Sequence, residues 1–304
     1  MSSSTSPTRT VHVVTDSTCS LPADLARRWG VHVVPLQVVV DGRAHLEGVD
    51  LSTGDLVRAL DDHASLSTSQ PTPRAFAEAY ERAAGEGAER IVSLHLSGEL
   101  SGTVHAAALA ARDASVPVDV VDSRTVAMGL GFAVLAAARE AAHGASGPVV
   151  ARTALRVASS STAMFVVDSL DHLRRGGRLS ATSAAIGTAL GLRPVLGLRA
   201  GHVEVVQKIR TRAAVVERLV AAGIAAAQED VDTRIAMHHL GDDSVVWECA
   251  GRITDATGRE VVVSPVSAVL GAHVGPGLLA LITARDLPPA DVPHSAPGSS
   301  PSHR

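Results

Sequence analysis

The stretch VHVVTDSTCSLPADLARRWG, residues 11–30, decides the fold class. Its first part is a run of β-branched residues that predicts a strand. Its second part predicts a helix in which Pro22 stands early and Gly30 marks the end. Between the two lie small polar residues, Thr15 to Thr18. A strand, a polar turn and a helix in this order make a βα unit, the building block of a largely parallel sheet.

The same alternation continues through the first half of the chain. Further strands are predicted at VHVVPLQVVV, RIVSLHL and VDVVDS, and helices at TPRAFAEAYERAAGEG, SGTVHAAALAARDAS and MGLGFAVLAAAREAAHG. Four or five strands with helices between them predict a three-layer α/β/α sandwich with a mainly parallel sheet. In such sheets ligands bind outside the carboxyl ends of the strands.

The second half predicts another α/β domain. RPVLGLRAGHVEVVQKIR should form a β-hairpin that turns at Ala200 and Gly201, because apolar runs flank a short glycine-containing turn. The segment GAHVGPG leads into LLALITA, which we expect to be an apolar helix. The predicted organisation is a disordered tail at 1–10, a first domain at 11–160, a second at 161–286 and a second tail at 287–304.

Composition argues against several classes of protein. The chain has 304 residues, 46% of them apolar, so sizeable cores can form, yet no apolar run approaches the roughly 18 residues that a membrane helix needs. A net charge of -4 and 2% aromatic residues argue against nucleic-acid binding. Cys19 and Cys249 lack disulfide or zinc spacing, which favours a reducing cytoplasm. The adjacent His238 and His239 would point to opposite faces of a strand, so no metal site is predicted.

The segment LSGELSGT, residues 96–103, lies between a predicted strand and a predicted helix. Neither Ser97 nor Ser101 has the preceding glycine of a GxSxG nucleophile turn, and the chain has no GxxxxGK[ST] phosphate loop. The first amides of a helix have no internal partners and favour an anion, and glycine lets a ligand approach the backbone. Ser101 and Gly102 therefore predict either an anion site or an ordinary helix cap.

Two other segments have the character of ligand clamps. TSQPTP, residues 68–73, places hydroxyl groups before a proline-stiffened helix start, which predicts a second anion-binding helix terminus at Thr68. GAHVGPG, residues 271–277, holds His273 among three glycines and a proline, at what we expect to be a helix entrance. An imidazolium at that position would suit a carboxylate.

Six segments in a fixed order carry a resemblance to a known family. They are VTDSTCSLP, TSQPTP, LSGTVHAA, VDS followed by MGLG, LRRGGRLS and GAHVGPG. Each is common alone, but the ordered set is specific. From about Val11 to Asp286 the chain resembles the DegV family. The resemblance implies a two-domain fold, an α/β/α sandwich plus a second α/β domain, with one long-chain fatty acid buried between them.

The resemblance also implies which residues hold the ligand. By motif, the expected carboxylate-binding residues are Thr68, Ser101 and His273. Residues expected in a second rank, lining the cavity or facing a partner, are Ser97, Gly102 and Arg178. No metal and no cofactor besides the fatty acid ligand is expected. Three such donors with helix amides could hold a carboxylate without a buried arginine, whose desolvation is costly.

The family also suggests a partner. Some DegV proteins are the binding subunit of bacterial fatty acid kinase, so the resemblance implies an ATP-binding kinase that phosphorylates the presented carboxylate, for phospholipid metabolism. This chain would then be a lipid-binding protein and no enzyme. The alternative is a serine hydrolase that attacks acyl substrates through Ser101 or Ser97, with His273 as the base.

Overall fold

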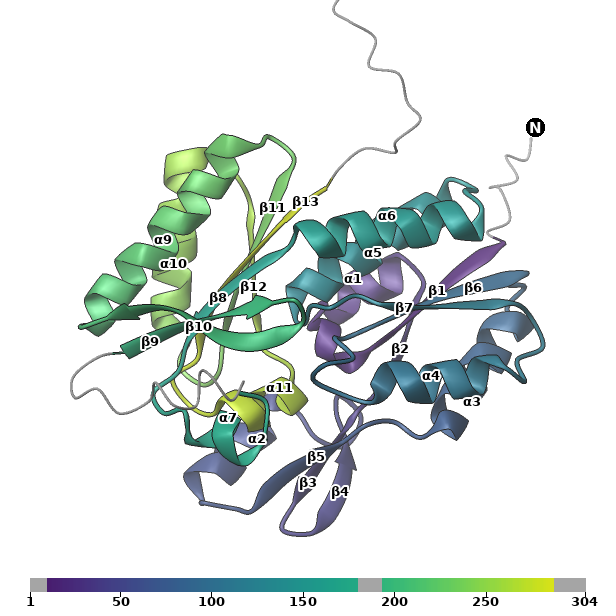
Figure 1. Ribbon diagram of the computed structural model, residues 1–304, viewed down its shortest axis with the longest axis horizontal. Coiled ribbons are helices and arrows are strands. Elements are labelled where there is room, and N and C mark those ends of the chain that lie inside the picture. Colours follow the sequence, from purple (N-terminus) through teal and green to yellow (C-terminus); the bar gives the residue numbers. More distant parts are fainter. Residues whose placement is uncertain (1–9, 180–192, 287–304) are drawn as a thin grey trace, which may run out of the picture.

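The computed structural model describes residues 10–179 and 193–286. Two large sheets lie next to each other, with helices on their outer faces and between them (Figure 1). Apart from Thr10, the two predicted tails fall outside the described residues. Within the described ranges, no helix combines the length and the apolar character needed to cross a membrane.

The first sheet is parallel throughout, as predicted. Its strands, in spatial order, are β2 (Val31–Val34), β1 (Val11–Asp16), β6 (Arg90–His95) and β7 (Val118–Asp122). All four carboxyl ends therefore lie at one edge of the sheet, where the polar residues of the sequence motifs follow the strands.

Helices cover both faces of this sheet, which confirms the predicted α/β/α sandwich (Figure 1). The helices are α3 (Pro73–Gly85) and α4 (Thr103–Ala111) on one face, α5 (Met128–Ala142) and α6 (Gly147–Ser160) on the other, and α1 (Ala23–Arg28) beside β2, after the short 3-10 turn η1 (Ser17–Cys19). Neighbouring strand residues point to opposite faces. Val14 accordingly packs under α3 and α4, whereas Val13 packs under α5 and α6.

The second sheet has six strands and is mixed. In spatial order they are β10 (His202–Ile209), β9 (Arg193–Arg199), β8 (Thr162–Val166), β13 (Leu279–Arg285), β11 (Thr233–His239) and β12 (Val261–Pro265). The hairpin β9–β10 turns at Ala200 and Gly201, as predicted, and both have positive φ. The helix predicted for LLALITA is wrong, because this segment forms strand β13 at the centre of the sheet, buried on both faces. A short apolar run has no periodicity that separates a central strand from a buried helix.

Two groups of helices pack on the second sheet. One face carries α9 (Arg212–Glu229) and α10 (Ser244–Thr257). The other face meets α5 and α6 at one end and, at the other, α7 (Asp171–Arg175) and α11 (Ala268–Val274). The helices α5 and α6 thus pack against both sheets. The division at residue 160 matches the point where the chain passes from α6 to β8, and the proposed domains stay a prediction.

A small third sheet was not predicted. Its strands are β4 (Arg43–Leu46), β3 (Gln37–Val40) and β5 (Leu66–Ser69), all antiparallel, and α2 (Thr53–Asp61) lies between β4 and β5 in the chain. The run VHVVPLQVVV, expected to be one extended segment, is divided at Pro35 into β2 of the first sheet and β3 of the third. Proline has no N–H to donate to a sheet ladder, so a strand readily ends there.

Candidate functional site

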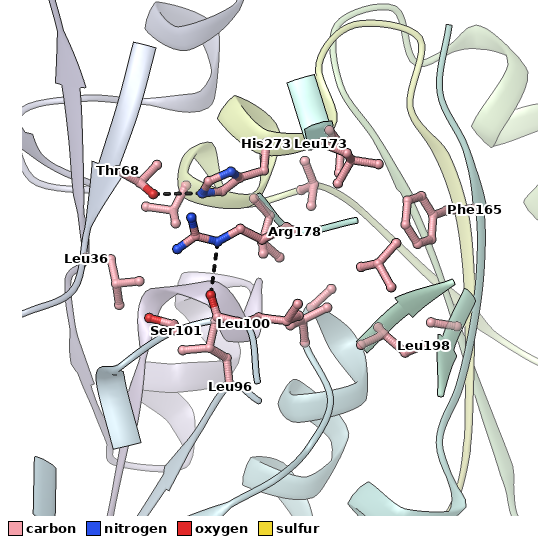
Figure 2. Close-up of a pocket in the computed structure, with 18 of the residues that line it drawn as sticks. Leu36, Thr68, Leu96, Leu100, Ser101, Phe165, Leu173, Arg178, Leu198 and His273 are labelled. Carbon is pink, nitrogen blue, oxygen red and sulfur yellow. Dashed lines mark hydrogen bonds between the residues drawn. The ribbon is translucent and has the colours of Figure 1, made fainter. Parts of the chain in front are cut away.

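A cavity of about 350 Å³ lies where the three sheets meet. Most of its wall is apolar, with Leu96 from the first sheet's edge and Phe165 and Leu198 from the second sheet (Figure 2). Ile282 of the second sheet also lines it. Ligand pockets typically have volumes of about 300–1,000 Å³. The cavity is therefore large enough for a sizeable apolar ligand. All three expected carboxylate-binding residues, together with Gly102 and Arg178, are among its lining residues.

Thr68 reaches the cavity from strand β5 of the small sheet. The prediction that it lies at a helix terminus is wrong, because α3 begins at Pro73 and is capped by the hydroxyl of Thr72. The Thr68 Oγ1 atom lies 2.7 Å from Nε2 of His273, so the two side chains are hydrogen bonded (Figure 2). Thr68 thus presents a hydroxyl that is already oriented by a neighbour.

His273 lies in the last turn of α11, which corrects the expectation that it stands at a helix entrance. Burial, together with the positive charge of Arg178, lowers the pKa of His273 to about 4. The ring is therefore neutral near pH 7, whereas an imidazolium was expected from the sequence. A neutral imidazole still carries one N–H donor.

Ser101 and Gly102 lie at the beginning of α4, as predicted. The first hydrogen bond of the helix runs from the Ala106 N–H to the Gly102 carbonyl. The Ser101 hydroxyl lies 2.8 Å from Oγ1 of Thr103 and accepts the Thr103 N–H at 3.4 Å. The Ser101 hydroxyl therefore accepts the first amide of α4 and also lines the cavity, whereas the N-cap residue of the helix is Gly102.

Close contacts at two glycines bring the motif segments of the sequence together in pairs. A Cβ on Gly102 would lie 2.0 Å from Oε1 of Gln70, and a Cβ on Gly176 would lie 2.4 Å from Nδ1 of His273. Any larger residue would push these side chains away. TSQP thus packs against LSGT, and GGR packs against HVGPG. Gln70, which lines the cavity, was not among the predicted site residues.

Arg178 lines the cavity between His273 and the turn that carries Ser101 (Figure 2). Its Nε donates a hydrogen bond to the Leu100 carbonyl at 3.1 Å. Arg178, expected in the second rank as a lining or partner-facing residue, is thus half-buried in the cavity wall. Arg178 supplies the positive charge that neutral His273 lacks, and its hydrogen bond to the chain keeps its guanidinium oriented.

Ser97, expected in the second rank, is fully buried and is not among the cavity-lining residues. Its hydroxyl donates to the Gly201 carbonyl at 2.9 Å and accepts the Glu99 N–H at 3.3 Å. Gly201 is the turn residue of the β9–β10 hairpin. Ser97 therefore connects the first half of the chain to the second by a hydrogen bond, which is a structural role.

The cavity wall also includes His238, which is not one of the residues placed near the ligand's head group (Thr68, Ser101, Arg178 and His273, called the head-group residues below). His238 on β11 is fully buried, and its burial lowers its pKa to about 4. Its Nε2 accepts the Met128 N–H at 3.2 Å, and its Nδ1 lies 3.1 Å from the Ser264 carbonyl. Both ring nitrogens have partners and the ring is neutral, so His238 is compatible with an apolar ligand beside it.

In the part of the chain that the structure describes, no hydrolytic triad is assembled at this site. Among residues 10–179 and 193–286, no carboxylate is hydrogen bonded or ion paired to His273, whose Nε2 contacts Thr68 and no serine. A Ser–His–Asp run does occur elsewhere: Ser93 Oγ lies 2.7 Å from Nε2 of His95, and Nδ1 of His95 lies 3.1 Å from Asp16. All three are fully buried, so no substrate reaches them. Asp16 also accepts the Leu96 N–H, so this network fixes the loop that leads to Ser101.

A second cavity, of about 840 Å³, adjoins the head-group residues. It shares Thr68, Arg178 and His273 with the first, and its wall includes the basic side chains of His172 and Arg175. The head-group residues therefore stand between an apolar cavity and a wider, more polar one.

Comparisons with known proteins agree with this arrangement. The family model described as "Uncharacterised protein, DegV family" matches residues 10–286. A DegV domain-containing protein of Streptomyces coelicolor is 46% identical over 277 residues, which are 90% of this chain and 98% of the relative. One from Mycobacterium tuberculosis is 38% identical over 275 residues, 88% of this chain and 95% of the relative.

Solved structures with the same fold include two that are described as fatty acid binding. A DegV family protein from Thermus thermophilus has a TM-score of 0.83 and 35% identity, and the match covers 90% of this chain and 99% of that one. DegV from Bacillus subtilis has a TM-score of 0.85 and 29% identity, over 91% and 99% of the two chains. By its sequence and its fold, this chain belongs to the DegV family.

Proposed function

We propose that this protein binds one long-chain fatty acid, with the tail in the apolar cavity and the carboxylate at Thr68, Ser101 and His273. The observation that carries the proposal is the polarity of the cavity: hydroxyl, imidazole and guanidinium groups from separate segments gather at one end of an otherwise largely apolar wall. A fatty acid has the same distribution of polarity. The two solved relatives described as fatty acid binding support this reading.

The carboxylate would be held by the neutral side chains of the head-group site, and the Arg178 guanidinium would be the one cation near it. The hydrogen bond between Thr68 and His273 positions both side chains before the ligand arrives. A hydrogen bond to an ionised group contributes more than one between neutral groups. The Arg178 guanidinium would balance the negative charge of the carboxylate, and the amides at the start of α4 would add donors near Ser101.

The tail would supply most of the affinity. Burying one methylene contributes about 0.8 kcal/mol, so a chain of about fifteen carbons could give more than about 10 kcal/mol before ordering costs. The wall contributed by the second sheet, Phe165, Leu198 and Ile282, and the apolar ends of the first would surround such a chain. We propose residues 11–160 and 161–286 as the two domains between which it lies.

We also propose that the protein is a non-catalytic subunit that presents the carboxylate to a separate ATP-dependent fatty acid kinase. The second cavity supports this step, because it adjoins Thr68, Arg178 and His273 from outside and includes Arg175. A phosphoryl donor could approach the carboxylate from that side. Arg178 would then face both the bound ligand and the partner.

Mass spectrometry of the purified protein tests the binding proposal. Denaturing extraction after expression with fatty acids available should yield about one fatty acid per chain, and the Thr68→Ala/Ser101→Ala double variant should retain much less. Purified protein that repeatedly contains no lipid would contradict binding, and unchanged loading of the double variant would contradict the head-group assignment.

The kinase step needs its own experiment. The loaded protein, mixed with the kinase of its own organism and ATP, should yield acyl phosphate, and neither protein alone should do so. A hydrolase role for Ser101 or Ser97 predicts labelling by a fluorophosphonate probe. We expect no labelling, because no carboxylate orients His273 in the described part of the chain.

A further inference from the structure

Three side chains of metal-ligand type meet at the opposite end of the first sheet from the cavity. His12 is the second residue of β1, His32 is the second residue of β2, and Glu86 directly follows α3. In the sheet His32 lies opposite Val14, two residues along β1 from His12. Side chains two apart share a face, so both imidazoles lie on the side that α3 covers, where Glu86 reaches them.

The ligand atoms are spaced as the ligands of one ion are. Nδ1 of His12 lies 3.3 Å from Nε2 of His32, and Nε2 of His32 lies 3.4 Å from Oε2 of Glu86. All three atoms lie within 4.8 Å of one another. Two atoms bound to Zn²⁺ at 2.0–2.1 Å with tetrahedral angles are about 3.4 Å apart. The two measured separations therefore match two edges of a zinc coordination tetrahedron.

The orientation of the two rings fits the same site after a small adjustment. Their planes differ by 19° and their centroids are 5.6 Å apart, so the rings meet edge to edge through nitrogen. The two nitrogens point at each other, and turning each ring by roughly 35° would aim both lone pairs at a common point about 2 Å away.

Hydrogen bonding and metal binding make different demands on these three ligand atoms. Nε2 of His32 faces a nitrogen of His12 and a carboxylate oxygen of Glu86, and it carries at most one proton for the two contacts. A divalent cation accepts a lone pair from all three atoms at once. The His32 side chain is only 14% exposed, so these contacts are largely shielded from water, whereas Glu86 is 55% exposed and leaves an entry path.

We propose that His12, His32 and Glu86 form a binding site for a divalent transition metal ion, with Zn²⁺ as the best fit and water as the fourth ligand. Two imidazoles and one carboxylate are an established zinc ligand set. The ion would connect β1, β2 and the end of α3. The sequence did not suggest the site, because the two histidines are 20 residues apart and Glu86 is farther still along the chain. The proposal differs from the expectation, made from the sequence, that there is no metal site.

Zinc titration of the full chain, after chelator treatment and dialysis, tests the proposal. Calorimetry should find one high-affinity Zn²⁺ per chain, and saturating zinc should raise the melting temperature, because the assembled site of the folded state binds the ion more tightly than the unfolded chain does. His32→Ala and Glu86→Gln should each weaken binding by about tenfold or more, since even the loss of an outer-shell partner has costs of that size. Glu86→Gln is the safer variant for folding because Glu86 is exposed.

A matched control is His143→Ala, which removes an exposed histidine at the end of α5. It should leave zinc affinity and the melting shift unchanged. Equal zinc affinity in wild type, His32→Ala and Glu86→Gln, or no zinc binding by the wild type, would overturn the proposal. Fatty acid content should stay the same in Glu86→Gln, so the outcome is independent of the function proposed above.

Discussion

The hydrogen bond between Thr68 and His273 allows a quantitative test of the head-group site. Thr68→Val keeps the shape of the side chain and removes the hydroxyl that lies 2.7 Å from Nε2 of His273. The variant would lose a donor to the carboxylate, worth about 1.5–3 kcal/mol for a bond to an ionised group, which is roughly a 10- to 150-fold increase in Kd. Displacement of a fluorescent fatty acid from delipidated protein measures this change.

The His273→Gln variant completes a double-mutant cycle. If the imidazole acts on the carboxylate by orienting the Thr68 hydroxyl, the double variant should bind about as weakly as the worse single variant, with a coupling energy of at least about 1 kcal/mol. Ser67→Ala is the matched control, because Ser67 is an exposed neighbour on β5 outside the apolar cavity. Single variants within twofold of wild type, or fully additive losses, would refute the reasoning.

Three further predictions concern charge and burial. Asp16→Ala removes the buried carboxylate that holds His95, and it should lower the free energy of unfolding by about 3 kcal/mol or more in urea titrations. Burial lowers the pKa of His238 and His273 from 6.5 to about 4, so the unfolded chain binds more protons between these values. The free energy of unfolding should therefore fall as the pH drops from about 6.5 to 4, and His238→Gln should reduce the slope in pH-dependent melts. Arg178→Gln removes a positive charge beside His273, and NMR titration should find a raised pKa for that imidazole; an unchanged value would contradict the contact.

Much of the fold could be predicted from local patterns. Alternating β-branched and alanine-rich segments give the parallel sheet and its helices, and the hairpin follows from one turn signal at Ala200 and Gly201. The small sheet could not be predicted this way, because its strands have only four residues each. In addition, the segment that contains α2 separates β4 from β5 in the chain. Strand β13 was misassigned since a central strand is apolar on both faces.

Positions in the cavity wall could be predicted by motif, whereas the way in which they are arranged could not, and their role in binding a carboxylate stays a prediction. Thr68, Ser101 and His273 do line one cavity, although they come from a strand, a helix start and a helix end. The position of Arg178 and the charge state of His273 depend on contacts between residues far apart in the sequence. Arg178 lines the cavity because of the turn at Leu100, and the neutral state of His273 depends on burial that no local pattern contains.

Helix α5 has a consequence for how the chain folds in the cell. All but three of its 15 residues are buried. One side of the helix packs against the first sheet, and the other side packs against the second sheet near Ile282. A ribosome-bound chain that has completed only the first 160 residues would expose the second of these sides to water. Such an intermediate exposes an apolar surface that favours aggregation, and it persists until β13, the last strand among the described residues, is synthesised. Truncation before that strand should therefore produce aggregates, and chaperone dependence should be greatest late in synthesis.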